Sequence, residues 1–454
     1  MSNSIVVEVK NDVYALLILG FLCDTFFMFS AMVFVGAFLV RLRGFQKLTT
    51  IEEALQLLFS NLKIEKLKTA FVPLHEALNR VLAEDVIARE DLPRFDRSAV
   101  DGYAVKAEDT VEASQFKPKI LQITEEDEIG DGQAKQVWTG TPIPKGANAV
   151  VMIENTKKVN MKIEVWTSVT PGENVSKKGE DVSKGQVALK TGTRLRPHHL
   201  GLLAALGITK VKVFEKPKIA ILATGNELVE IGEKPKEDQI FEVNRLVLSG
   251  LCHELGAEPL DLGIARDDAN EIFEKIKLGL EKADAVITTG GTSVGASDLV
   301  PEAVNRIGKP GVIVHGVAMR PAMPTALAIA NGKPIIILSG NPVAAMIGFE
   351  VFMRPLICRM LGLKREESRP MVKAKMTRRI STFLGRKTFV RVHVFQHHDE
   401  LFAEPISAKG SGIISTMTKA NGYVIVPENR EGLEEGENVS VHLFDNVDVV
   451  DENV

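Results

Sequence analysis

Between residues 218 and about 361, short apolar runs alternate with longer stretches in which apolar residues recur every three or four positions. The short runs predict buried strands, and the periodic stretches predict helices that cover them. This alternation is typical of a doubly wound α/β domain, whose ligands bind beyond the carboxyl ends of the strands. The expected strands are 219–223, 260–264, 285–289, 326–330 and 334–338, and the expected helices are 243–255, 269–282, 299–307 and 343–361.

Glycine or polar residues directly follow four of these expected strands. Because parallel strands present their carboxyl ends at one edge of a sheet, we expect these residues to gather there. The pattern therefore predicts a ligand site at this edge. The sequences concerned are Thr224-Gly225-Asn226-Glu227, Arg266-Asp267-Asp268, Gly290-Gly291 and Ser339-Gly340-Asn341-Pro342.

The loop after strand 285–289 has the composition of an anion-binding turn. Gly290 and Gly291 would let a ligand approach the backbone, and the first amides of the following helix would point at negative charge. Asp298 would then stand beside a bound phosphate, where a carboxylate is unfavourable unless a cation lies between them. Asp298 is therefore a candidate Mg²⁺ ligand, and a helix-capping role is the alternative.

The segments on either side follow other patterns. Thr50 and Glu53 form a capping box ahead of an apolar stripe, and a second stretch with helical spacing follows it. Strand-like runs separated by turns then predict an inserted β domain, and the tail is again strand-like. The expected helices are 51–62, 74–83 and 199–206, and the expected strands are 119–123, 149–153, 162–166, 389–395, 423–426 and 439–444.

These changes of pattern predict a multidomain α/β protein, as its length of 454 residues also suggests. The expected parts are an apolar extension at 1–44, a helical and β linker domain at 45–90 plus 182–216, an inserted β domain at 91–181, the α/β domain at 217–364, and a C-terminal β domain at 365–454.

Composition excludes some classes of partner. The net charge is −4, so no overall basic field predicts nucleic-acid binding. The cysteines Cys23, Cys252 and Cys358 lie far apart in the sequence and form no CxxC pair. We therefore expect buried thiols in a reducing compartment.

A largely apolar run over residues 13–40 precedes this pattern. It is long enough to cross a bilayer, and the basic residues after it would hold the rest of the chain in the cytoplasm. A membrane anchor, a core helix and translated upstream sequence from a misassigned start are the three interpretations. In each case we expect the globular part to lie in the cytoplasm.

Beyond single loops, an ordered series of motifs resembles the MoeA/gephyrin E-domain family, the molybdopterin molybdenumtransferases, from about Leu48 to about Phe444. The α/β domain would then be a molybdopterin-binding domain similar to MogA, and the C-terminal domain would resemble a β-barrel. The motifs are Pro93 to Val105, Thr139-Gly140-Thr141-Pro142, Gly179-Glu180-Asp181, Thr224 to Leu228, Asn244-Arg245, Gly263 to Asp268, Thr288 to Asp298, Arg320 to Pro324, and Ser339 to Pro342.

The resemblance implies insertion of molybdate, or of tungstate, into adenylylated molybdopterin, with release of AMP in the presence of Mg²⁺. It also implies a homodimer, and an adenylyltransferase is a candidate partner for delivering the substrate. Molybdopterin adenylyltransferase activity and a non-catalytic molybdopterin-binding scaffold are the alternative functions.

The same resemblance implies a role for each site residue. Asp101 and Thr139 match positions that the family brings to its active cleft, although Asp101-Gly102 alone is typical of an ordinary turn. Ser411 lies in a glycine-flanked turn that could equally be a surface turn. Phosphate binding is implied for Gly290, Gly291, Ser293 and Gly295, Mg²⁺ binding or water positioning for Glu227, Asp267 and Asp298, and molybdate binding for Arg320, Pro324, Asn341, Arg391 and Ser411. The turn Gly340-Asn341-Pro342 is expected at the same site.

Four residues depart from the commonest family pattern. Asn226 stands where aspartate is usual, and Met323 stands where lysine is frequent. Ser339 replaces a proline and Ala344 replaces a serine. Loss of one carboxylate and one ammonium nearly balances the local charge, so we expect an active site, in which either the affinity for the oxyanion or the choice between molybdate and tungstate could differ from that of the family.

Overall fold

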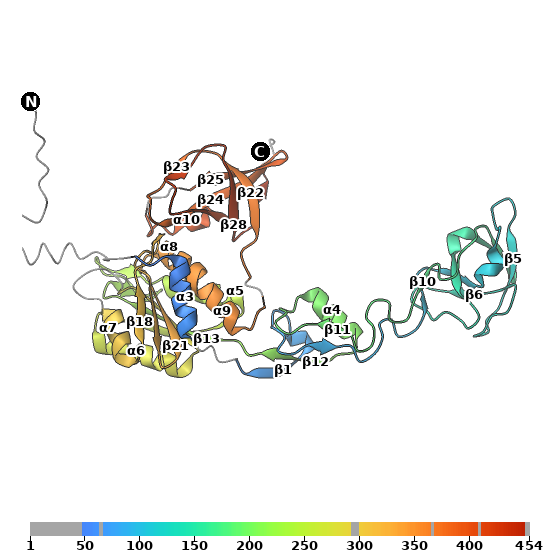
Figure 1. The fold of residues 1–454 in the computed structure, drawn as a ribbon, viewed down its shortest axis with the longest axis horizontal. Helices are drawn as coiled ribbons and strands as arrows, with labels where there is room; N and C mark the ends of the chain where they lie inside the picture. Colours follow the sequence, from blue (N-terminus) through green and yellow to red (C-terminus); the bar gives the residue numbers. More distant parts are fainter. Residues whose placement is uncertain (1–47, 63–66, 292–298, 365–366, 407–409, 450–454) are drawn as a thin grey trace, which may run out of the picture. The chain divides into compact units, whose positions relative to one another are not determined.

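The computed structural model of the protein describes residues 48–62, 67–291, 299–364, 367–406 and 410–449 (Figure 1). The chain forms two compact units, which we describe one at a time. The first contains Met1–Lys66, Lys216–Met360 and Arg365–Val454, and the second contains Leu67–Glu215 and Leu361–Lys364. Within the described ranges, no helix is both long enough and apolar enough to cross a bilayer. The apolar run 13–40 lies outside these ranges.

The first unit is built on a six-stranded sheet with the order β16-β13-β17-β21-β20-β18. The first four of these strands are parallel, whereas β20 and β18 run antiparallel to their neighbours. The doubly wound prediction is confirmed, although strand β18 was not expected from the sequence. The bounds are Lys218–Thr224 (β13), Glu258–Ala265 (β16), Ala285–Thr289 (β17), Gly311–His315 (β18), Ala326–Ala330 (β20) and Lys333–Leu338 (β21).

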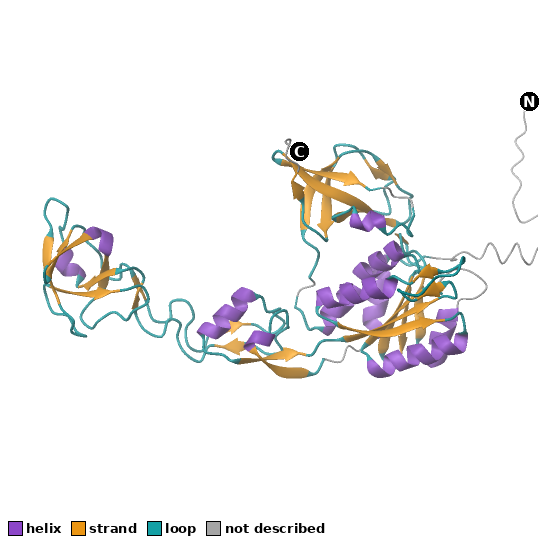
Figure 2. Cartoon of the chain, turned by 180° about the vertical axis from the view of Figure 1, so that it is seen from behind, coloured by secondary structure: helices purple, strands orange, loops and turns teal. Residues whose placement is uncertain are grey.

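Helices cover both faces of this sheet (Figures 1 and 2). Helices α6 and α7 pack against each other, and their apolar residues form a core with the strands. The helices are α3 (Ile51–Asn61), α5 (Asn244–Leu255), α6 (Ala269–Lys282), α7 (Leu299–Ile307), α8 (Pro342–Gly348) and α9 (Arg354–Met360). The single helix expected over 343–361 is interrupted, because a π-helical turn, η5 (Phe349–Met353), separates α8 from α9.

Helix α3 begins where the capping box predicted, since the Thr50 hydroxyl accepts a hydrogen bond from the Glu53 amide at 3.2 Å. The helix packs against β18 and β20 and thus belongs to the first unit. The segment 45–90, expected to form one linker domain, is therefore divided between the two units. Burial of Ala54 and Leu58 against the α/β sheet accounts for this difference.

The C-terminal part of the first unit is a closed barrel of five strands. Its longest strand, β24 (Lys387–His397), pairs with both β25 and β26, which closes the circle. Alternate residues of β24, among them Val390, Val392 and Val394, fill the interior. The remaining barrel strands are β22 (Met371–Met376), β25 (Glu400–Pro405), β26 (Gly422–Val426) and β28 (Asn438–Leu443), and short elements beside them are β23 (Ile380–Ser381), β27 (Gly432–Leu433), β29 (Asp448–Val449) and α10 (Ser415–Thr418).

A short strand, β19 (Met319–Arg320), joins the α/β domain to the barrel by pairing with β24. Arg320 lies opposite Thr388 in this pairing. Two other short strands, β14 (Leu228–Val229) and β15 (Ile240–Phe241), pair beside the sheet edge. Residues far apart in the sequence thus meet near the carboxyl ends of the parallel strands.

The second unit contains the linker strands and the inserted β domain. In the linker part, β1 pairs with β12 and β2 with β11, next to helix α4. The inserted domain has a sheet with the order β7-β4-β6-β5-β9-β8. The bounds are β1 (Thr69–Pro73), β2 (Val86–Ile87), β3 (Arg97–Ser98), β4 (Gly102–Val105), β5 (Lys119–Ile123), β6 (Gln133–Val137), β7 (Ala149–Met152), β8 (Thr156–Val159), β9 (Lys162–Val165), β10 (Val175–Ser176), β11 (Val187–Leu189), α4 (Pro197–Ala205) and β12 (Lys210–Phe214).

The helix expected over 74–83 is wrong. Only the 3₁₀ turn η2 (Leu74–Glu76) forms there, and Asn79 adopts a positive φ of 62°. The amides of Asn79 and Leu82 donate to carbonyls of the returning chain, at Leu195 and Thr193. The apolar residues have helical spacing because several of them are buried. The backbone groups, however, form tertiary hydrogen bonds in place of the hydrogen bonds of a helix.

Candidate active site

The carboxyl ends of β16, β13, β17 and β21 lie side by side, as the sequence predicted. The register shows it directly, since Thr224 pairs with Ala265 and Thr289 pairs with Leu338. Residues that follow β13, β17 and β21 surround a cavity of about 360 Å³, which we call the strand-edge cavity. It is lined by Thr224, Glu227, Leu228, Ile240, Asn244, Thr289, Gly290, Gly291, Pro324, Ser339, Gly340 and Asn341.

A second cavity of about 650 Å³, the barrel-facing cavity, lies where the α/β domain meets the barrel. Pro324, Ser339 and Asn341 line both cavities, so the two share a wall. The barrel-facing cavity brings together the residues for which molybdate binding was expected, namely Arg320, Pro324, Asn341, Arg391 and Ser411.

The glycine pair after β17 is shaped by close packing. A Cβ on Gly290 would lie 2.4 Å from the Thr224 carbonyl oxygen, and Gly290 has a φ of +88°. A Cβ on Gly291 would lie 2.6 Å from a methyl group of Val300. The Gly290 amide donates to the Leu338 carbonyl at 3.1 Å. Gly290 therefore forms the turn, and its own amide is engaged within the sheet.

Two carboxylates occupy the turns after β13 and β16. Glu227 folds back over Gly225, because an added Cβ on Gly225 would lie 2.5 Å from the Glu227 carboxylate. The Asn226 amide donates to the Asp267 carboxylate, and the Asp267 amide donates to the Asn226 side-chain oxygen, both at 3.2 Å. The two turns are thus joined, although Asp267 is not among the residues that line the strand-edge cavity.

Mg²⁺ sites are usually made of one or two carboxylates, waters and phosphates of the substrate. Glu227 and Asp267 fit that requirement chemically. Ser293, Gly295 and the third expected ligand, Asp298, lie outside the described residues. In the part of the chain that the structure describes, no group of three or more His, Cys, Asp or Glu residues could hold a metal ion.

Arginine side chains bring positive charge to the barrel-facing cavity. Arg391, on β24, is only 4% exposed, and burial lowers the pKa of its guanidinium below the ordinary value. An anion in the cavity would stabilise this buried charge. The backbone carbonyl of Ser411 accepts a hydrogen bond from the Val343 amide at 3.1 Å, which anchors the Ser411 turn at the start of α8.

Residues that the sequence did not single out also line the barrel-facing cavity, among them Phe383 and Arg386. The guanidinium carbon of Arg320 lies 4.9 Å from the centre of the Phe383 ring, a cation–π contact. Phe383 is 68% exposed. Phe383 and Arg386 both lie in the turn between β23 and β24, where nothing in the local sequence pattern pointed to a ligand.

The departures from the family pattern have local explanations in two cases. The Ser339 hydroxyl accepts a hydrogen bond from the Asn341 amide at 3.3 Å, so it supports the turn that a proline would otherwise stiffen. Asn226 replaces a carboxylate that would stand beside Asp267. Met323 and Ala344 line the barrel-facing cavity without a polar contact that would explain them. Pro342 is the first residue of α8.

Asp101 and Thr139 belong to the second unit and contact each other there. The amide and the hydroxyl of Thr139 both donate to one oxygen of Asp101 at 2.7 Å. These two hydrogen bonds lower the pKa of the Asp101 carboxyl below its ordinary value. The carboxylate is therefore held in its ionised form and in a fixed position.

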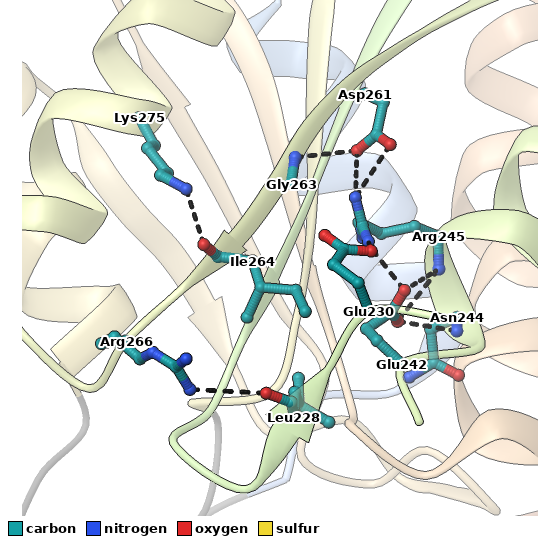
Figure 3. Close-up of polar contacts among 10 residues, drawn as sticks. All are labelled: Leu228, Glu230, Glu242, Asn244, Arg245, Asp261, Gly263, Ile264, Arg266 and Lys275. Atoms are coloured by element: carbon teal, nitrogen blue, oxygen red, sulfur yellow. Dashed lines mark hydrogen bonds and ion pairs between the residues drawn. The ribbon is translucent and has the colours of Figure 1, made fainter. Parts of the chain in front are cut away.

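Asn244 and Arg245 are the first two residues of helix α5 (Figure 3), and Asn244 lines the strand-edge cavity. Arg245 is bonded to three carboxylates, those of Glu230, Glu242 and Asp261. The Asn244 side chain donates to the Gly340 carbonyl at 2.8 Å. The family resemblance includes this pair of residues but implies no role for it, because a sequence does not show which polar side chains become buried.

Comparison with known proteins matches most of the chain. Family descriptions that read "MoeA N-terminal region (domain I and II)", "Probable molybdopterin binding domain" and "MoeA C-terminal region (domain IV)" match residues 49–207, 220–359 and 373–444. The molybdopterin molybdenumtransferase of Bacillus subtilis is 37% identical over 389 residues, which cover 83% of this chain and 90% of that protein. The chain belongs to the MoeA family of molybdopterin molybdenumtransferases.

Other members of the MoeA family agree with this assignment. The molybdopterin molybdenumtransferase of Haemophilus influenzae is 33% identical over 390 residues, covering 84% of this chain and 95% of that protein. A crystal structure of a molybdopterin biosynthesis MoeA protein from Pyrococcus horikoshii OT3 has a TM-score of 0.76 and 37% identity, and the match covers 88% of this chain and all of that one. The predicted family and fold class are confirmed, and the chain is an enzyme of this family.

Proposed function

We propose that this enzyme inserts molybdate, or tungstate, into adenylylated molybdopterin and releases AMP in an Mg²⁺-dependent reaction. The observation that carries the proposal is the shared wall of the two cavities. The strand-edge cavity is walled by glycines and uncharged groups, with one carboxylate, Glu227. The barrel-facing cavity contains Arg320, Arg386 and Arg391. A neutral organic part and an oxyanion can therefore be held next to each other.

The residues divide the work by their chemistry. Arg391 and Arg320 attract and orient the oxyanion, and burial of Arg391 strengthens its interaction with an anion. Glu227 and Asp267 would hold Mg²⁺, which would supply positive charge against the phosphates of the substrate. Positioning and charge neutralisation carry most of the rate, since cleavage of an activated phosphoanhydride needs no protein nucleophile. Asp101, fixed by Thr139, is a further candidate for orienting water or substrate.

Family resemblance extends the proposal to partners. We expect a homodimer, and an adenylyltransferase as the source of the adenylylated substrate. Matches to MoeA regions on both sides of the α/β domain favour the molybdenum-inserting activity over the adenylyltransferase alternative.

The test is AMP release by the purified protein from adenylylated molybdopterin with Mg²⁺ and either molybdate or tungstate. We expect release that depends on the oxyanion. Arg391→Met should raise the half-saturating molybdate concentration about 10- to 100-fold, the usual effect of losing a hydrogen bond to a charged group. Arg379→Met serves as the matched control, because this barrel arginine pairs with Glu434 and lines neither cavity. AMP release at the same rate with and without either oxyanion would refute the proposal.

A further inference from the structure

The side-chain oxygen of Asn244 is buried without a hydrogen-bond partner among the described residues. Asn244 is only 6% exposed and lines the strand-edge cavity. An acceptor buried in this way costs free energy until a donor reaches it. Asn244 borders the strand-edge cavity, so a donor group of a ligand bound in that cavity would lie beside this residue.

The orientation of the amide group is set by its other contact. The Asn244 Nδ2 group donates to the Gly340 carbonyl oxygen at 2.8 Å. A carbonyl oxygen only accepts hydrogen bonds, so a flipped amide would place two acceptors against each other. Nitrogen therefore faces Gly340, and oxygen is the atom left for another group.

The backbone of Asn244 is also held in place. One carboxylate oxygen of Glu242 accepts the Asn244 amide at 2.7 Å and the Arg245 amide at 3.1 Å (Figure 3). Glu242 is 3% exposed and is itself bonded to the Arg245 guanidinium at 3.0 Å. Arg245 is in turn clamped by Asp261 at 2.6 and 2.8 Å. Arg245 is thus a positioning residue that fixes the first turn of α5.

An oxygen that can only accept selects against most of the charged parts of the substrate. Phosphate and molybdate present mainly acceptors at neutral pH, whereas pterin and adenine carry N–H groups and ribose carries hydroxyls. A preorganised acceptor therefore recognises the organic part of the substrate rather than its phosphates.

We propose that Asn244 is a specificity-determining residue whose Oδ1 accepts a hydrogen bond from an N–H or O–H donor of the pterin or nucleoside part of the substrate, in the strand-edge cavity. The inference rests on the proposed function, since that function supplies the substrate. It adds the group that reads the organic part of the substrate and places that part, not the oxyanion, next to α5.

The test compares ligands as well as variants. Calorimetry would measure the affinity of the full-length protein and of Asn244→Leu for molybdopterin, AMP, inosine monophosphate, 2′-deoxy-AMP and 3′-deoxy-AMP. Leucine is close to asparagine in volume and lacks polar side-chain atoms. Leu246→Ala is the matched control, because Leu246 lies on the same helix and is 67% exposed.

We expect Asn244→Leu to weaken the ligand that carries the recognised donor about 10- to 100-fold, the effect of leaving a buried polar group unpaired. A nucleotide lacking that donor should bind the variant and the wild type alike. Loss confined to molybdopterin assigns the donor to the pterin. Loss with AMP but not with one of its analogues assigns it to the adenine amino group or to one ribose hydroxyl.

An equal loss of affinity for all ligands would reveal a purely structural role and overturn the inference. Unchanged affinity would also overturn it, because it would mean that a bound water satisfies Asn244. If Asn244→Leu does not fold, the affinities of the wild-type protein for AMP and its analogues still show whether a nucleotide donor is recognised. A milder variant, Asn244→Ser, then tests whether the affinity for molybdopterin depends on Asn244. The proposed function fails separately, when the wild-type protein binds adenylylated molybdopterin but releases no AMP with either oxyanion.

Discussion

At the scale of single residues, the pair Asn226 and Asp267 shows how one substitution changes the electrostatics of a site. Their side chains and amides are joined by reciprocal hydrogen bonds at 3.2 Å. An aspartate at 226 could keep the same contact to the Asp267 amide. It would also place a second carboxylate beside Asp267, which is favourable only with a cation nearby.

We predict that Asn226→Asp raises the affinity for Mg²⁺ and lowers the free energy of unfolding by up to about 1 kcal/mol when Mg²⁺ is absent, since both side chains are exposed. Added Mg²⁺ should restore the stability. Thermal unfolding with and without Mg²⁺ measures this. Asn160→Asp, in the turn between β8 and β9, adds the same charge elsewhere. Equal responses of the two variants to Mg²⁺ would contradict the placement of the ion.

The contact between Phe383 and Arg320 leads to a second prediction at the scale of single residues. This contact fixes the direction of a guanidinium that lines the barrel-facing cavity. Phe383→Ala should raise the half-saturating molybdate concentration about 2- to 5-fold, because an exposed cation–π contact is worth roughly 0.5–1 kcal/mol. Phe383→Trp should retain wild-type behaviour in the AMP-release assay. Its exposed neighbour supplies the control, Leu384→Ala, and an equal effect there would argue against the contact.

At the scale of elements, the sequence predicted most of the α/β domain, because each strand and helix carries its own apolar period. Helix α6 and strand β17 have the bounds that were expected. The apolar period gave a wrong prediction at 74–83, where residues buried against the chain at 193–195 have the spacing of a helix without forming one. It could not show the π-helical turn η5 either, since this turn is defined by its backbone hydrogen bonds, which a pattern of apolar positions does not report.

The turn after β17 gives a prediction for this scale. Gly290→Ala should destabilise the protein by more than about 2 kcal/mol, because the new Cβ meets the Thr224 backbone in addition to the strain of a positive φ. Gly332, in the turn between β20 and β21, also has a positive φ of 76°, but a Cβ there meets nothing within 4 Å. Gly332→Ala should therefore cost only about 1 kcal/mol. Denaturant unfolding that gave equal losses would disprove the packing argument.

At the scale of the molecule, the candidate site could be predicted only in part. Strand-end residues were found because topology sends them to one edge, and this holds for Glu227, Gly290 and Asn341. Phe383 and Asn244 were not found as site residues. Their positions depend on the pairing of β19 with the barrel and on the burial of the first turn of α5, which no local pattern encodes.

The junction of the α/β domain with the barrel contains a buried ion-pair network that depends on pH. Glu350, on η5, is bonded to Arg354 at 2.7 Å and to Arg369, just before β22, at 2.7 Å. Burial alone would raise the pKa of the Glu350 carboxyl, but the hydrogen bonds from both arginines outweigh it and lower that pKa below its ordinary value. The folded state thus binds the proton of this group less readily than the unfolded chain does.

A carboxyl with a lowered pKa stabilises the fold at pH values above its unfolded pKa, about 4.3, and this contribution is lost as the pH falls through the folded value. We therefore predict that acid lowers the melting temperature of the first unit below about pH 4. Glu350→Gln should cost about 3 kcal/mol at neutral pH, because it removes the buried carboxylate that Arg354 and Arg369 share and leaves them, among the described residues, only the half-exposed Glu254, and it should flatten the acid dependence. The more exposed pair Glu437 and Arg430 provides the control. Glu437→Gln should change stability by less than about 1 kcal/mol, and an effect as large as that of Glu350→Gln would show that burial is not what makes the junction sensitive to acid.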